Sequence, residues 1–168
     1  TDKNSVVILA EPAKKGTILT ETKSGATYKV TGSDPKKPEV EYKAPKNKKE
    51  TKVVIPDTVT IDGVEYAVTS IAKNAFKNNK KLTEVKIGKN VTSIGDNAFA
   101  GCKNLRKVEL NENLMTIGKN AFKNCKRLKT ITIKSTKLNK KNVKKGAFKG
   151  ITAKTVIKVP KSRLAAYR

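Results

Sequence analysis

The chain has 168 residues, which is enough for one domain, or one domain with a small appendage. It carries 38 Lys and Arg residues against 14 Asp and Glu, so its formal net charge is +24, and its lack of histidine excludes every catalytic arrangement that uses one. The positive charge is uneven, because residues 113–168 hold 17 basic residues and no acidic residue. No apolar run approaches the length of a membrane-spanning helix.

Residues 1–50 are expected to form an N-terminal leader and a β-hairpin cap. Two alternating segments, Ala26–Thr31 and Glu39–Lys43, lie on either side of a turn that contains Gly, Asp and Pro. Alternation on both sides of such a turn is typical of a hairpin. The chain begins without Met and without an apolar signal core, so we expect a processed chain from which any export signal has been removed.

Residues 51–168 are expected to form a second unit made of repeats. It opens with a strand at Val53–Ile55, which Pro56 ends. An insertion follows, and its Asp62-Gly63 pair is the strongest short signal for a hairpin. We expect this two-stranded flap to cover the open edge of the first coil, since solenoids protect their ends.

A repeat of 23 residues runs through the rest of the chain. Phe76, Phe99 and Phe122 are 23 residues apart, Phe148 follows after 26, and each comes directly after an alanine. The apolar pattern L-x-x-V-x-I keeps the same interval. A fixed period in the low twenties predicts a solenoid, in which each coil buries its apolar face only against its neighbours. The phenylalanine rings should therefore form a single interior column.

Each coil is expected to contain two extended segments joined by a turn at Asn-Ala-Phe. The residue two positions before each phenylalanine is Asn74, Asn97, Asn120 and then Gly146. Asn and Gly tolerate positive φ and also cap helices, so a tight turn or the start of a short helix is predicted there. The fourth coil, from Leu138, is distorted, as terminal repeats usually are. After Pro160, Ser162 is expected to cap a short C-terminal helix over residues 163–168.

This pattern resembles the BspA-type leucine-rich repeat family, whose consensus is close to L-x-x-I-x-I-P-x-x-V-x-x-I-G-x-x-A-F-x-x-C. The matching stretches are VTSIGDNAFAGC from Val91, LMTIGKNAFKNC from Leu114, and the strands LRKVEL and LKTITI. The resemblance implies an α/β leucine-rich-repeat solenoid, a right-handed superhelix that is rich in β-strands with short helices or turns. The chain departs from the consensus at the first cysteine position, which Asn79 takes, and at three proline positions.

The resemblance also implies a function. Members of the family are typically exported or surface-displayed bacterial proteins, so we expect an extracellular or cell-surface location. The expected role is a non-catalytic recognition or adhesion module with a host or cell-surface protein as its partner. No enzyme activity, metal or cofactor is expected. Two alternatives stay open, a basic module that binds a cell-wall polymer or sulfated glycan, and a structural spacer.

The polyanion alternative depends on basic residues in the turns around Ala-Phe, which should stack from coil to coil. Lysine outnumbers arginine by 34 to 4 and no aromatic residues are interleaved, which argues against base recognition. A solvated flank that keeps the protein soluble is the competing interpretation. The candidate polyanion-binding residues are Lys80, Lys103, Lys119, Lys123, Lys126, Arg127, Lys145 and Lys149.

Two further expectations concern neighbouring coils. Outward strand positions place Glu84 beside Lys107 and Lys86 beside Glu109, so this face should partly neutralise its own charge. It is then either structural or a surface that binds a ligand without bulk charge. Cys102 and Cys125 are one repeat apart and within reach of a disulfide, but parallel side chains make its dihedral angle awkward. Buried free thiols are favoured over a disulfide.

Overall fold

The computed structural model describes residue 5 and residues 9–161, and this part of the chain consists of β-strands and turns without an α-helix. The α/β class is therefore wrong for the described residues, and of the short helices or turns expected within the coils, the structure has turns. The helix predicted for residues 163–168, with its cap at Ser162, lies outside them. The described strands are β1 (Ile18–Thr20), β2 (Thr27–Gly32), β3 (Glu39–Ala44), β4 (Lys52–Ile55), β5 (Thr58–Ile61), β6 (Val64–Ile71), β7 (Glu84–Ile87), β8 (Ser93–Ile94), β9 (Lys107–Leu110), β10 (Thr116–Ile117), β11 (Thr130–Ile133) and β12 (Val156–Lys158).

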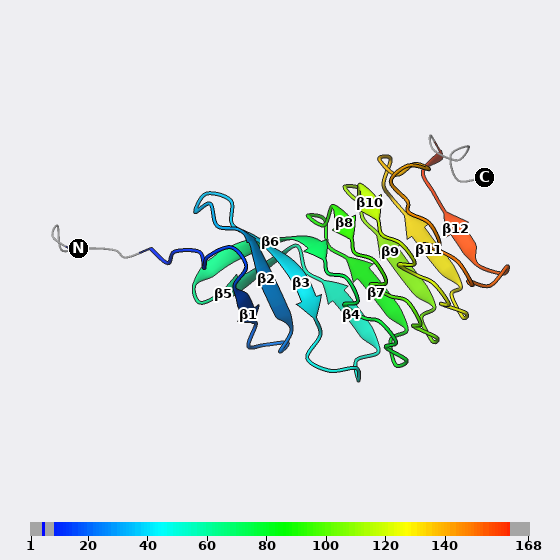
Figure 1. The fold of residues 1–168 in the computed structure, drawn as a ribbon, viewed down its shortest axis with the longest axis horizontal. Coiled ribbons are helices and arrows are strands. Elements are labelled where there is room, and N and C mark those ends of the chain that lie inside the picture. Colours follow the sequence, from blue (N-terminus) through cyan, green and yellow to red (C-terminus); the bar gives the residue numbers. More distant parts are fainter. Residues whose placement is uncertain (1–4, 6–8, 162–168) are drawn as a thin grey trace.

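The strands form two sheets that run along the molecule (Figure 1). The five-stranded sheet has the order β12-β11-β9-β7-β4 and is parallel throughout. The seven-stranded sheet follows the order β1-β2-β3-β6-β8-β10, and β5 pairs with β6 beside this path. Each coil of the repeat contributes one strand to the first sheet and one short strand or bridge to the second. This arrangement is a β-solenoid of the leucine-rich-repeat type, as the period predicts.

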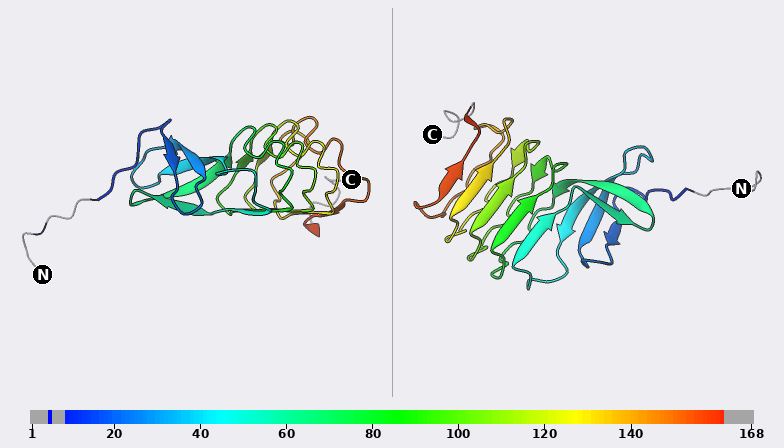
Figure 2. Two further views of the ribbon diagram at one scale, coloured as in Figure 1. Left: turned by 90° about the horizontal axis from the view of Figure 1, so that it is seen from below. Right: turned by 180° about the vertical axis from the view of Figure 1, so that it is seen from behind.

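In β4, β7, β9 and β11 of the five-stranded sheet, every second residue is buried in the core, whereas all three residues of β12 are exposed. In β7, Val85 and Ile87 are buried, and the same two positions are buried in β4, β9 and β11. Each fully buried aliphatic side chain contributes about 1.5–3 kcal/mol of transfer free energy. One coil buries too few of them to fold alone, so the stacked coils seen in Figure 2 depend on one another.

The phenylalanine rings form the predicted column. The rings of Phe76, Phe99 and Phe122 are stacked with centroids 5.1 Å apart and planes within 4° of parallel, and Phe148 continues the stack at 5.4 Å. The column also has a member that the repeat pattern did not reveal, since the Tyr42 ring of β3 stacks on Phe76 at 5.3 Å. The N-terminal strands and the repeats therefore share one core.

The turns that carry these rings have a left-handed backbone at the predicted positions, with φ of 63° at Asn74, 57° at Asn97 and 56° at Asn120. Alternate N–H groups of one turn donate to carbonyl groups of the next coil. The Phe76 N–H, for example, lies 2.7 Å from the Ala98 oxygen. Because these donors are used between coils, they are not available for the bonds that build an α-helix. This accounts for turns, the first of the two predicted alternatives, in place of short helices.

Both predicted hairpins are present. Strands β2 and β3 pair antiparallel, and β5 and β6 are joined by Asp62 and Gly63, which both have positive φ. The edge of the first coil is covered differently from the expectation, because β3 pairs in parallel with β6 and places Tyr42 opposite Ile71. The flap strand β5 pairs with the first half of β6. The division of the chain into units at residue 50 stays a prediction.

Both cysteines are free thiols in the core. Each Sγ lies 3.2 Å from a carbonyl oxygen of the preceding coil, Cys102 from Phe76 and Cys125 from Phe99. Burial raises the pKa of the Cys102 thiol to about 12 and raises that of Cys125 as well.

We expect these thiols to resist a thiol-reactive disulfide reagent at mildly alkaline pH, because the thiolate is the reacting species and the folded protein holds almost none of it. Labelling of the native protein should be at least ~100-fold slower than labelling in guanidinium, where both cysteines become accessible. Reaction of either cysteine at the unfolded rate under native conditions would contradict its burial.

Candidate binding surface

The predicted basic residues lie on the surface of the turns. All are exposed except Lys123, which is half-buried. Backbone pairing places Lys119 and Lys145 at equivalent positions of adjacent coils, since the Asn120 N–H next to Lys119 donates to the Lys145 oxygen. This row is not continuous along the molecule, because Asp96 takes the position equivalent to Lys119 in the second coil.

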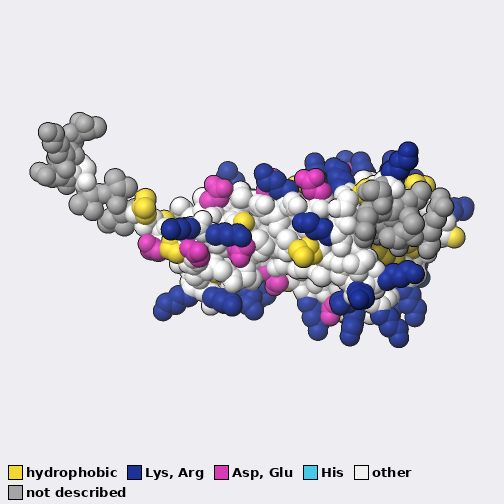
Figure 3. All heavy atoms as spheres, turned by 90° about the horizontal axis from the view of Figure 1, so that it is seen from above, with side chains coloured by type: hydrophobic (Ala, Val, Ile, Leu, Met, Phe, Trp, Pro, Cys, Tyr) yellow, Lys and Arg dark blue, Asp and Glu magenta, His cyan; other side chains and the backbone are white. Residues whose placement is uncertain are grey.

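Charge is segregated along the solenoid. Figure 3 shows acidic side chains over the N-terminal part and the middle of the molecule, with Lys and Arg dominating towards the C-terminal end. Two ion pairs lie among the described residues on the side of the five-stranded sheet. Exposed Lys52 pairs with half-buried Glu84, and exposed Lys134, just after β11, pairs with half-buried Glu109. The basic turns of the third and fourth coils face solvent without such partners among the described residues.

The outward face of the five-stranded sheet is ordered in rows. Register places equivalent positions of β4, β7, β9, β11 and β12 beside one another, as the sequence predicts for Glu84 beside Lys107 and for Lys86 beside Glu109. The first row is Lys52, Glu84, Lys107, Thr130 and Val156, and the second is Val54, Lys86, Glu109, Thr132 and Lys158.

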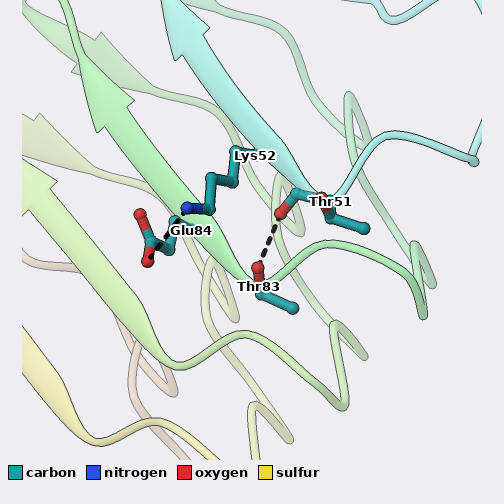
Figure 4. Close-up of polar contacts among 4 residues, drawn as sticks. All are labelled: Thr51, Lys52, Thr83 and Glu84. Atoms are coloured by element: carbon teal, nitrogen blue, oxygen red, sulfur yellow. Dashed lines mark hydrogen bonds and ion pairs between the residues drawn. The ribbon is translucent and has the colours of Figure 1, made fainter.

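Opposite charges meet within these rows. Lys52 Nζ lies 4.0 Å from Glu84 Oε1, and the Thr83 hydroxyl beside this pair donates to the Thr51 oxygen at 2.9 Å (Figure 4). Lys134 forms an ion pair with Glu109, and its hydrogen bond holds the pKa of that carboxyl below its usual range. The exposed pairs stabilise strand register by a few tenths of a kcal/mol at most.

A hollow of about 520 Å³ opens where β4, β7 and β9 end. At this edge Gly88 lets adjacent coils pack closely, since a Cβ there would lie 2.6 Å from the Ile55 oxygen of the preceding coil. The neighbouring Asn111 side chain is buried and donates to the Gly88 and Val91 carbonyl groups, which fixes this edge of the sheet. The hollow is lined by Val54, Ile55, Asp57, Lys86, Ile87, Gly88, Lys89, Glu109, Asn111, Glu112 and Lys134.

A second hollow of about 220 Å³ adjoins it along the sheet and shares Val54, Lys86 and Glu109 with the first. We call the two together the sheet trough. Its charged groups have both signs, and the aliphatic Val54 side chain is 65% exposed in its wall. Such a surface suits a ligand that presents an apolar group between charges of both signs. The sequence predicted which strand residues face the trough, but it did not point to the loop residues Asp57, Lys89 and Glu112. The one signal for these three residues is their place in the repeat, just after a strand.

Within the described part of the chain, no three or more His, Cys, Asp or Glu residues come together as metal ligands. A helix long and apolar enough to cross a bilayer is likewise absent from that part.

Stacked coils with a parallel sheet on one side and an interior phenylalanine column define a leucine-rich-repeat protein. A family profile described as the BspA type leucine-rich repeat region matches residues 64–165 in six copies. The chain therefore belongs to the family of BspA-type leucine-rich repeat proteins, as its repeats indicated. A search of curated proteins gave no significant match.

Solved structures with the same fold include a leucine-rich repeat protein from Bacteroides capillosus, which is 27% identical with a TM-score of 0.69 over 90% of this chain and 99% of that one. A leucine-rich repeat protein from Bacteroides ovatus is 28% identical with a TM-score of 0.62, covering 82% of this chain and 36% of that one. A leucine rich cell surface protein from Faecalibacterium prausnitzii is 21% identical with a TM-score of 0.60, covering 88% of this chain and 44% of that one, and shares the fold.

Proposed function

We propose that the chain is a non-catalytic recognition module, displayed outside the bacterial cell, that binds a protein partner through the sheet trough. Membership of the BspA-type family supports a binding role, since solenoids present extended surfaces rather than enclosed reaction sites. Adhesion to a host or cell-surface protein is the form of this role that we favour.

The observation that carries the proposal is the mixed character of the sheet trough. In a chain with a net charge of +24, Asp57, Glu109 and Glu112 line one hollow together with three lysines. A nearly balanced surface beside an exposed Val54 is suited to specific contact with a protein, whereas a uniformly basic surface attracts any anion.

A matched pair of variants tests the proposal. Val54→Glu places a carboxylate in the trough, while Met115→Glu makes a comparable change at an exposed apolar side chain beside β10, outside the five-stranded sheet. Purified extracellular matrix proteins would be immobilised and probed with each variant at ~150 mM and ~500 mM salt, the higher of which screens exposed charges. We expect wild type and Met115→Glu to be captured at both salt concentrations, and Val54→Glu to bind at least tenfold more weakly.

Equal binding by Val54→Glu and Met115→Glu would contradict a role for the trough. No capture of wild type by any matrix protein would contradict adhesion and favour the structural spacer.

A basic module for a cell-wall polymer or sulfated glycan is the second candidate. The stacked, exposed lysines around Lys119 and Lys145, in a part of the chain without acidic residues, favour it. Attachment that collapses between about 50 and 200 mM salt would indicate this function, because counterion release dominates such binding.

A further inference from the structure

A third hollow lies at the opposite ends of the sheet strands, where β9, β11 and β12 begin. Its volume is about 280 Å³, and four of its six lining residues are basic while none is acidic. Arg106 and Arg127, which line it, are the two arginines of the described residues, although lysine dominates the chain. The lining residues are Arg106, Arg127, Leu128, Lys129, Thr152 and Lys154.

The repeat itself brings these charges together. Arg106 and Lys129 are 23 residues apart, and the Lys129 N–H donates to the Arg106 oxygen at 2.8 Å, so the two residues lie side by side on adjacent coils. The next coil adds Lys154, whose N–H donates to the Thr152 hydroxyl at 3.2 Å. Like charges held this close repel one another, which costs stability unless an anion offsets it.

One arginine is held in a fixed orientation. Arg127 Nη1 donates to Asn104 Oδ1 at 2.9 Å, and the Asn104 amide in turn donates to the Lys80 oxygen at 2.7 Å. The remaining guanidinium donors keep their fork geometry, which matches the oxygens of a sulfate, phosphate or carboxylate group. The described ion pairs, Lys52 with Glu84 and Lys134 with Glu109, include none of the four cations in the hollow.

We propose that this hollow binds an oxyanion group of a sulfated glycan. Arg106 and Arg127 supply the forked donors, while Lys129 and Lys154 add charge from either side. The hollow is small for a ligand pocket, which suits one sulfate and part of the sugar that carries it. None of the described residues that line it is aromatic, so they offer no platform on which a base could stack, and this favours a glycan over a nucleic acid.

The test compares variants that remove the same charge at different places. Arg106→Gln/Arg127→Gln removes two charges from the hollow, and Lys36→Gln/Lys37→Gln removes two from the exposed turn between β2 and β3, which belongs to neither candidate surface. A fluorescein-labelled heparin oligosaccharide would be titrated by fluorescence anisotropy at ~150 mM salt, where long-range attraction is screened. We expect at least a tenfold loss of affinity for the hollow variant and at most a twofold loss for the turn variant.

A charge-preserving variant separates geometry from charge. Arg106→Lys/Arg127→Lys keeps both positive charges but loses the forks, so its affinity should fall between wild type and the glutamine variant. Equal losses for the two glutamine variants would overturn the proposal and leave nonspecific attraction. Failure of wild type to bind the oligosaccharide would also overturn it, as would tighter binding of a DNA duplex of equal charge.

This site is independent of the sheet trough. Val54→Glu should leave the affinity for the oligosaccharide unchanged, because Val54 does not line the hollow. Val54→Glu should lose matrix-protein capture and retain glycan binding, and Arg106→Gln/Arg127→Gln should do the reverse. This pair of results would assign each activity to its own surface.

Discussion

Replacing Phe99 with alanine should lower the free energy of unfolding by about 3–5 kcal/mol, the usual cost of removing a buried aromatic ring. Phe99 is fully buried and lies between Phe76 and Phe122, with centroids 5.1 Å from each. Its loss opens a cavity in the middle of the column, where coils on both sides depend on it. Urea unfolding followed by circular dichroism measures the change, and cooperativity should fall together with stability.

Phe148→Ala is the matched control. This ring is only half-buried and stacks on one neighbour, Phe122, so its removal should cost clearly less than removal of Phe99. Equal and mild effects at both positions would mean that the rings contribute little to the core.

Gly95→Ala should destabilise the protein at or above the upper end of the ~1–3 kcal/mol typical of overpacking. A Cβ at Gly95 would lie 2.5 Å from the Lys73 nitrogen and 2.8 Å from the Ile71 oxygen. Both atoms belong to the backbone of the preceding coil, so no side chain can rotate away and the coils must separate. The Gly95 N–H bond to the Ile71 oxygen, at 2.8 Å, would be strained by the same shift.

Gly32→Ala provides the comparison in the N-terminal hairpin. A Cβ there would meet only the Glu39 side chain, at 3.2 Å from Oε2, and this flexible group can move. We expect a thermal midpoint close to that of wild type for Gly32→Ala and a clearly lower one for Gly95→Ala. A similar small change for both would show that the coils do not approach as closely as their backbone contacts require.

The repeat period was sufficient to predict the stacked coils, because a side chain every 23 residues can only meet its equivalents if successive coils are in register. It predicted the ring column from Phe76 to Phe148 and the positive φ at Asn74, Asn97 and Asn120. The period did not predict the place of Tyr42 in the column, because the flap of β5 and β6 lies between Tyr42 and Phe76 in the sequence and breaks the 23-residue interval. The alternation of apolar and polar residues predicts a hairpin near the N-terminus, but it does not say which sheet edge the hairpin joins, because that depends on tertiary pairing.

The candidate sites were harder to predict for a related reason. Repeat arithmetic places Arg106 and Lys129 at one position, but the hollow also needs Arg127 from a neighbouring position and Lys154 from the irregular fourth coil. The sequence could not decide between a turn and a short helix at Asn-Ala-Phe, because Asn suits both a positive φ and a helix cap. In a solenoid, its N–H groups instead find acceptors on the next coil, as the Phe99 N–H does on Ala121 at 2.7 Å.

Nuclear Overhauser contacts between phenylalanine rings provide the most direct test of the stacking, using protein with specifically labelled rings. The rings should show contacts from Phe76 to Phe99 and from Phe99 to Phe122, whose centroids are 5.1 Å apart, and none from Phe76 directly to Phe122. Rings that show no contacts with one another, or that contact solvent, would contradict an interior column and the in-register coils that produce it.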